Sequence, residues 1–183
     1  MSIEQQHKDM VVRLAKPGED ILASLTPEKC HLWHMGTGVV GEVIECLEGV
    51  MNADAENVKE ELGDSLFYLE GLRNTICPER DIKDVPSDEE GLIIPEAIIL
   101  VGRILDKLKK VVAYNKEVDR FDLGNDILMM KHLLHQMIGR AGFTVEEVLQ
   151  HNIDKLDGKR YKDGYSDAAA KERADKEEEC SQK

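Results

Sequence analysis

The chain has little of several features that define whole classes of protein. Of its 183 residues, 4% are aromatic, five are proline and four are cysteine, and 24 basic residues face 37 acidic ones. So few aromatic residues require a mostly aliphatic core, which a helical protein tolerates easily. The formal net charge of −13 argues against binding of nucleic-acid polymers, because backbone binding depends on clustered Lys and Arg. A phosphorylated small molecule stays possible, since metal ions bridge negative charges.

The cysteines and the apolar segments favour a location in the reducing cytoplasm. Cys30, Cys46, Cys77 and Cys180 show neither a CxxC spacing nor a disulfide framework. The first ten residues contain no apolar run, so we expect no signal peptide. The richest apolar stretch, LIIPEAIILVG, contains a proline and a glutamate and is far too short to span a membrane. We therefore expect a cytoplasmic protein with no membrane partner.

Apolar residues recur at helical spacing through most of the chain, and no alternating pattern persists long enough to indicate a half-buried strand. We therefore expect an all-α protein. Thr26 followed by Pro27 is a good helix start, and Thr144 with Glu147 three residues later is typical of a capping box. The expected helices cover about residues 27–50, 56–77, 95–114 and 120–139, a further one begins at residue 144, and a frayed one follows residue 166.

An internal repeat appears when the chain is shifted by 61 positions against itself. Residues 41–72 then align with residues 102–133 without a gap. Amphipathic helices of equal phase match at apolar positions by chance, so the alignment depends on its polar and glycine matches. The polar and glycine matches include Gly41 with Gly102, Glu56 with Glu117 and Gly63 with Gly124. The repeat predicts two tandem helical hairpins, packed as a pseudo-symmetric four-helix bundle with flanking helices.

The same repeat organises what we expect to be a single domain over residues 1–183. The first repeat covers about residues 31–77, a polar and acidic insert covers 78–93, and the second repeat covers about 94–140. A C-terminal helix and tail, residues 144–183, complete the domain.

Four carboxylates of the first repeat are spaced so that they converge. Glu42 and Glu45 lie three apart on one expected helix, and Glu61 and Asp64 lie three apart on the next, so each pair shares a helical face. In an antiparallel hairpin the two faces meet, and the like charges are unfavourable unless cations lie between them. Oxygen ligands of this kind suit Mg²⁺ or Mn²⁺. The alternative is a solvated acidic helix face without a metal.

The second repeat keeps the residue spacing of the first repeat but lacks some of its four carboxylates. At its equivalent positions stand Arg103, Asp106, Asp122 and Asn125. Residues 42–70 contain nine acids and one lysine, a balance of −8, whereas residues 103–131 contain five acids and seven bases, a balance of +2. We therefore expect the metal in the first repeat, with the second repeat as its partner.

Two segments of the first repeat, HMGTGVVGEVIECLEG and NVKEELGDSLFYLEGL, resemble the MazG-like, all-α nucleoside triphosphate pyrophosphohydrolase superfamily. The signature of that superfamily is a Glu-x-x-Glu helix followed by a Glu-x-x-Asp helix. The C-terminal segment NIDKLDGKRYKDGYS is also similar to the family's closing segment, with one extra residue between Lys155 and Arg160. The resemblance covers roughly residues 31–76 and 102–173.

The resemblance implies hydrolysis of a (d)NTP between its α and β phosphates, to a monophosphate and pyrophosphate, with Mg²⁺ or Mn²⁺ as cofactor. Glu42, Glu45, Glu61 and Asp64 would hold the metal; Glu42 and Glu45 would be catalytic, with Glu45 holding the attacking water as a base. The residues expected to bind substrate are Lys155, Arg160, Asn152 and Tyr161, and Arg103, Lys107 and Lys110 of the second repeat are weaker candidates for binding phosphate. Relatives with one repeat per chain build the bundle from subunits, whereas two repeats can supply it within one chain. We expect a homo-oligomer, and a monomer is the alternative.

Other interpretations remain open at the level of sequence. Trp33 either stacks on a nucleobase or packs in the core, and Tyr68 either lines the site or packs. A ferritin-like di-metal bundle needs two Glu-x-x-His helices, and the chain offers one, Glu28 with His31. A degenerate nucleotide-binding or regulatory protein without turnover is the other alternative, and the four intact carboxylates count against it. The preferred base is not specified by any residue.

Overall fold

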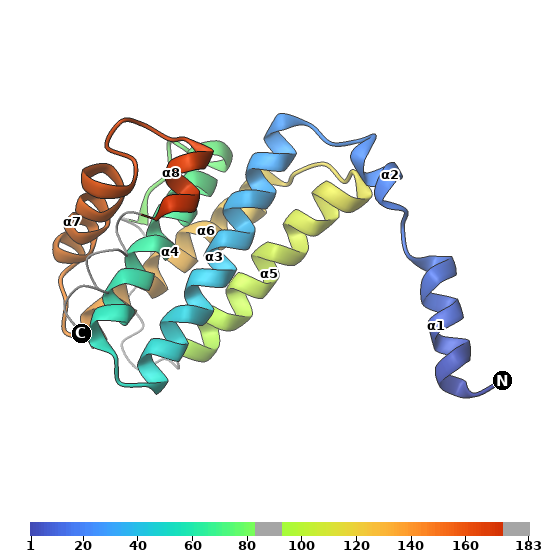
Figure 1. Ribbon diagram of the computed structural model, residues 1–183, viewed down its shortest axis with the longest axis horizontal. Helices are drawn as coiled ribbons and strands as arrows, with labels where there is room; N and C mark the ends of the chain where they lie inside the picture. The colour runs from blue at the N-terminus through green and yellow to red at the C-terminus, as the bar shows by residue number, and fades with distance from the viewer. Residues whose placement is uncertain (83–92, 174–183) are drawn as a thin grey trace.

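The computed structural model describes residues 1–82 and 93–173, and within these ranges every regular element is helical (Figure 1). The elements are α1 Ile3–Leu14, α2 Gly18–Leu22, α3 Pro27–Met51, α4 Ala55–Ile76, α5 Ile93–Tyr114, α6 Arg120–Arg140, α7 Val145–Lys155, the π-helical turn η2 Leu156–Arg160 and α8 Asp167–Glu172. The prediction of an all-α protein is confirmed. Among the described helices, none is both long enough and apolar enough to cross a membrane.

The helix boundaries follow the local signals in the sequence. Thr26 caps α3 by accepting a hydrogen bond from the Lys29 amide, and Thr144 and Glu147 form the expected capping box of α7. The helix α5 begins two residues earlier than expected, because Pro95 lies in its first turn, where a missing N–H costs nothing.

The four long helices enclose one aliphatic core. The helix α3 packs against α4 and α5, and α6 also packs against α4 and α5, so each hairpin contacts the other along both of its helices (Figure 1). The largest fully buried side chains are all aliphatic or methionine, as the low aromatic content requires; they include Leu32, Leu62, Leu69, Ile104, Leu108, Ile127, Met130 and Leu134. These contacts fit the expected hairpins, and the division into two repeats stays a prediction.

The other segments of the chain lie beside this core, away from it, or beyond the residues that the structure describes. The helix α7 packs against α4 and α6 and so brings the C-terminal segment beside the first hairpin. The helix α1, which the sequence did not predict, projects away from the other helices and buries none of its residues (Figure 1). Most of the expected acidic insert falls in residues 83–92, and the end of the tail falls in residues 174–183; both ranges lie outside the described residues.

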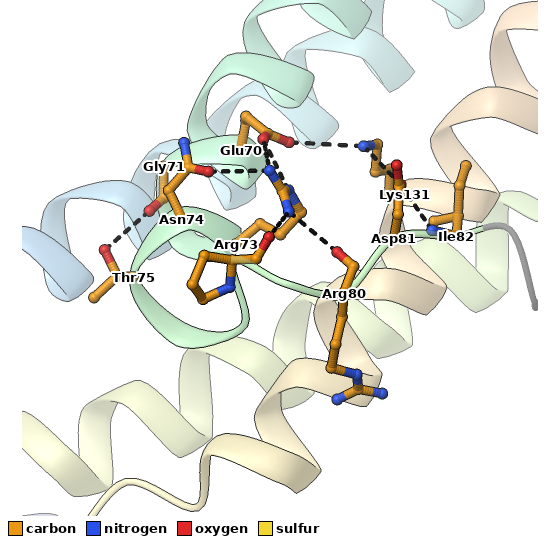
Figure 2. A network of polar contacts seen from close by, with 10 residues as sticks. Glu70, Gly71, Arg73, Asn74, Thr75, Arg80, Asp81, Ile82 and Lys131 are labelled. Atoms are coloured by element: carbon orange, nitrogen blue, oxygen red, sulfur yellow. Dashed lines mark hydrogen bonds and ion pairs between the residues drawn. The ribbon is translucent and has the colours of Figure 1, made fainter.

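A polar network attaches the chain after α4 to α6 (Figure 2). The Arg73 guanidinium donates to Glu70 at 2.8 and 2.5 Å and to the carbonyl oxygens of Pro78 and Arg80 at 2.8 and 3.1 Å. The Lys131 ammonium on α6 lies 3.3 Å from an Asp81 carboxylate oxygen and 3.7 Å from Glu70. Arg73, in the last turn of α4, therefore holds the segment that follows α4 against the end of this helix.

Candidate metal centre

Three glutamates from α3 and α4 lie close together at the interface between these two helices of the first hairpin. Glu42, Glu45 and Glu61 each offer a carboxylate oxygen, and these three oxygens all lie within 4.8 Å of one another. The short turn between α3 and α4 makes the helices antiparallel, so the two acidic faces meet as the spacing predicts. Clustered carboxylate oxygens are the donors that Mg²⁺ and Mn²⁺ prefer, so these residues fit a hard divalent cation.

Burial sets the electrostatics of this group. Glu61 is only 6% exposed, and burial, followed by its hydrogen bond to Glu42 and the surrounding acids, raises the pKa of Glu61 to about 8. Burial also raises the pKa of Glu42, which accepts the hydrogen bond of the protonated Glu61. Near neutral pH, a proton therefore occupies the place that a cation would take between two carboxylates.

Asp64, the fourth predicted ligand, is hydrogen-bonded by two residues of α7. Its Oδ1 accepts a hydrogen bond from Asn152 Nδ2 at 2.6 Å, and its Oδ2 accepts one from the Lys155 ammonium. Gly63 allows this approach, because a Cβ at this position would lie 3.1 Å from Asn152 Cβ and 3.4 Å from the Val148 carbonyl oxygen. Two residues predicted to bind substrate, Asn152 and Lys155, therefore contact a predicted metal ligand.

An aromatic cluster borders the carboxylates. The ring of Tyr68 makes edge contacts with His34 and Phe67, at centroid distances of 5.7 and 5.3 Å. Burial, followed by the charges of Glu42 and Asp64, raises the pKa of Tyr68. Gly38 lies under this ring, and a Cβ there would fall 2.4 Å from Tyr68 Cδ1. Tyr68 therefore packs against the core and also lies near Glu42 and Asp64, so the two roles that the sequence left open do not exclude each other.

Of the remaining predicted residues, Arg160 and Tyr161 lie near this centre. Arg160 ends η2 and Tyr161 follows it, and the electrostatic influence of both reaches the Tyr68 hydroxyl. Trp33 lies on α3, N-terminal to the glutamates, and is 38% exposed. Its role in stacking on a base stays a prediction.

Two neighbours of the site were missed at the level of sequence. Glu60 accepts a hydrogen bond from Lys155 Nζ at 3.1 Å, and the signal for it is its place four residues before Asp64, on the same helical face. The buried Cys46 thiol lies beside Glu61, and burial, followed by the Glu61 charge, raises its pKa to about 11. Cys46 also lines an apolar cavity of about 310 Å³, so its thiol packs there as a small apolar side chain.

Comparison with known proteins finds no matching family model, no matching curated protein and no matching solved structure. The function is therefore inferred from the chemistry of the carboxylate centre and from the signature that the sequence resembles.

The raised pKa of Glu61 predicts how stability depends on pH. Between about pH 4.5 and 8 the folded protein keeps a proton on Glu61 that the unfolded chain releases, so metal-free stability falls as pH rises through this window. We expect the melting temperature in EDTA to fall more steeply from pH 5 to pH 8.5 for the wild type than for Glu61→Gln. Circular dichroism melts at four pH values measure both slopes, and equal slopes would contradict the prediction.

Added Mg²⁺ should stabilise the wild type more at pH 8.5 than at pH 6, because at pH 8.5 the cation no longer competes with the proton on Glu61.

Proposed function

We propose that the protein is a Mg²⁺-dependent nucleoside triphosphate pyrophosphohydrolase that converts a (d)NTP to the monophosphate and pyrophosphate. The observation that carries the proposal is the approach of three glutamate oxygens within 4.8 Å, on the helices that bear the Glu-x-x-Glu and Glu-x-x-Asp signature. Such a concentration of carboxylates is unfavourable without a cation, and its cost is consistent with a functional site.

The residues fit the chemistry of this reaction. A bound Mg²⁺ supplies Lewis-acid polarisation of the phosphoryl oxygens and lowers the pKa of the attacking water. Glu42, Glu45, Glu61 and Asp64 would bind the cation, and Glu45, whose side chain is exposed, would also accept the proton of the attacking water. Lys155 and Arg160 would neutralise phosphate charge, and they lie on the C-terminal segment that follows the site.

The residues that would bind the nucleobase are less well defined than those that would bind the metal. The cluster of His34, Phe67 and Tyr68 offers ring faces and edges for a nucleobase, with Trp33 on the same helix as His34. These residues do not select one base. The homo-oligomer and the cytoplasmic location that we expect stay predictions.

A panel of (d)NTPs incubated with Mg²⁺ tests the proposal. We expect equal amounts of monophosphate and pyrophosphate from at least one nucleotide, full inhibition by EDTA, and recovery when Mg²⁺ or Mn²⁺ is restored. Ion-exchange chromatography of the products measures both. Release of inorganic phosphate with a diphosphate would refute cleavage between the α and β phosphates, and no product from any nucleotide with either metal would refute the enzyme.

A nucleotide-binding protein without turnover is the second candidate. One observation favours it, because Lys155 already neutralises Asp64. Equilibrium dialysis with the same nucleotides separates the two candidates, since binding without product formation would support the second.

A further inference from the structure

Lys155 is a buried cation in the middle of the acidic site. Its side chain is 7% exposed, and its ammonium lies between Glu60, at 3.1 Å, and Asp64, whose side chains are 12% and 14% exposed. The two acids lie four residues apart on α4, whereas the lysine comes from α7. A carboxylate so far removed from water is costly without a positive partner, and α7 supplies that partner.

The second hairpin also contains a lysine between two acids of one helix, and there the lysine belongs to a helix of the core. The Lys107 ammonium bridges Asp122 at 2.6 Å and Asp126 at 2.5 Å, and these acids also lie four residues apart on one helix. Asp122 stands at the position that Glu61 occupies in the first repeat. In the second hairpin the lysine comes from the long helix α5 of the core, with Arg103 adding a further ion pair to Asp126.

The two lysines differ in how firmly their helices are held. α7 is short, and within it only Val148, Asn152 and Lys155 are buried. By contrast α5 contributes eight buried residues, including Ile104 and Leu108, to the core. Moving Lys155 away from Asp64 therefore disturbs far less packing than moving Lys107 would.

We propose that Lys155 is a substitute cation, which neutralises Asp64 until a divalent metal displaces it, while Glu60 holds the displaced ammonium beside the site. This inference rests on the proposed function. Asp64 is available to a metal only in the fraction of molecules in which Lys155 has moved, and the apparent metal affinity falls by that fraction. Held by Glu60, the ammonium then lies next to the metal site, where the phosphates of a nucleotide would bind.

Binding of Mn²⁺ alone, without nucleotide, tests the proposal. In Lys155→Met the competing cation is absent, so we expect Mn²⁺ to bind at least about fivefold more tightly than in the wild type. In Glu60→Gln the ammonium has only Asp64 as a partner, so we expect a loss of Mn²⁺ affinity. Electron paramagnetic resonance of free Mn²⁺ measures both constants, and Lys162→Met, an exposed lysine after η2, is the matched control.

The opposite signs of the two effects distinguish competition from a structural role. A lysine that only holds α7 in place would, when replaced, weaken Mn²⁺ binding or leave it unchanged, and that result in a folded Lys155→Met variant would overturn the inference. Lys155→Gln serves as a second variant if Lys155→Met fails to fold by circular dichroism. If neither the wild type nor Lys155→Met binds Mn²⁺, both this inference and the pyrophosphohydrolase proposal are wrong; if the wild type binds Mn²⁺ and Lys155→Met binds it no more tightly, only the inference fails.

Discussion

Replacing Glu61 by Gln is expected to remove metal-dependent hydrolysis while leaving the fold intact. Glu61 is the most deeply buried of the three clustered glutamates, so no water replaces its oxygen, and the amide that remains is a poor ligand for Mg²⁺. Since even indirect support of a metal ligand is worth about 10- to 100-fold, we expect the loss of kcat/KM to be at least about 100-fold. Steady-state kinetics at saturating Mg²⁺ measure it.

The same variant separates a catalytic loss from a folding defect. Glu61 holds a proton near neutral pH, and glutamine resembles that protonated carboxyl in shape and hydrogen bonding. The melting temperature of metal-free Glu61→Gln should therefore equal or exceed that of the wild type at pH 7. Glu42→Gln and Asp64→Asn should also lose activity with their helicity preserved.

Glu48→Gln provides the control, because Glu48 is an exposed glutamate on α3, one turn after Glu45. It removes the same charge from the same helix and should leave kcat/KM unchanged. Activity of Glu61→Gln within threefold of the wild type would place the metal elsewhere, and a similar loss in Glu48→Gln would show that net charge, rather than ligation, is responsible.

The helices and the three-glutamate group were predictable because both depend on local spacing. Residues three apart share a helical face whatever the helix packs against. The short turn after Met51 makes α3 and α4 antiparallel neighbours, and this brings the two acidic faces together. The caps at Thr26 and Thr144 are equally local. The projecting helix α1 was not predicted, because its few apolar residues contact no core that would have selected their spacing.

The environment of Asp64 was not predictable from spacing, because it depends on a contact between residues 88 and 91 positions apart. The signature groups Asp64 with Glu61, yet the packing of α7 on α4 assigns both its oxygens to Asn152 and Lys155. For the same reason the local spacing does not assign Glu60 a partner, since the lysine that it binds comes from another helix.

The second repeat shows the same limit for its basic residues. From the sequence, Arg103 and Lys107 were weak candidates for binding phosphate. In the structure they pair with Asp126, an acid 4% exposed that stands at the position of Ser65 in the first repeat. Their charge is therefore compensated by acids of the same hairpin, without a phosphate ligand.

Replacing Lys107 by Met should destabilise the protein strongly while sparing the active site. Burial acts to raise the pKa of Asp126, but the hydrogen bonds from Arg103 and Lys107 outweigh it and leave that pKa below its ordinary value. Removing Lys107 takes away one of these two partners. Breaking a buried ion pair costs about 3–5 kcal/mol, and we expect about 3 kcal/mol here because Arg103 still donates to Asp126 at 3.0 and 2.5 Å.

Urea titration followed by circular dichroism measures this loss, and two further variants interpret it. The triple variant Arg103→Met, Lys107→Met, Asp126→Leu removes every charge of the group and should recover most of the lost stability, because buried ion pairs are replaced by apolar side chains at little cost. Lys110→Met, whose ion pair with Asp106 is about half exposed on both sides, should change stability little.

Well below its melting temperature, Lys107→Met should keep the kcat of the wild type, since Lys107 pairs with acids of the second hairpin. A folded Lys107→Met with raised KM for the nucleotide would instead make Lys107 a phosphate ligand and the second hairpin a part of the active site.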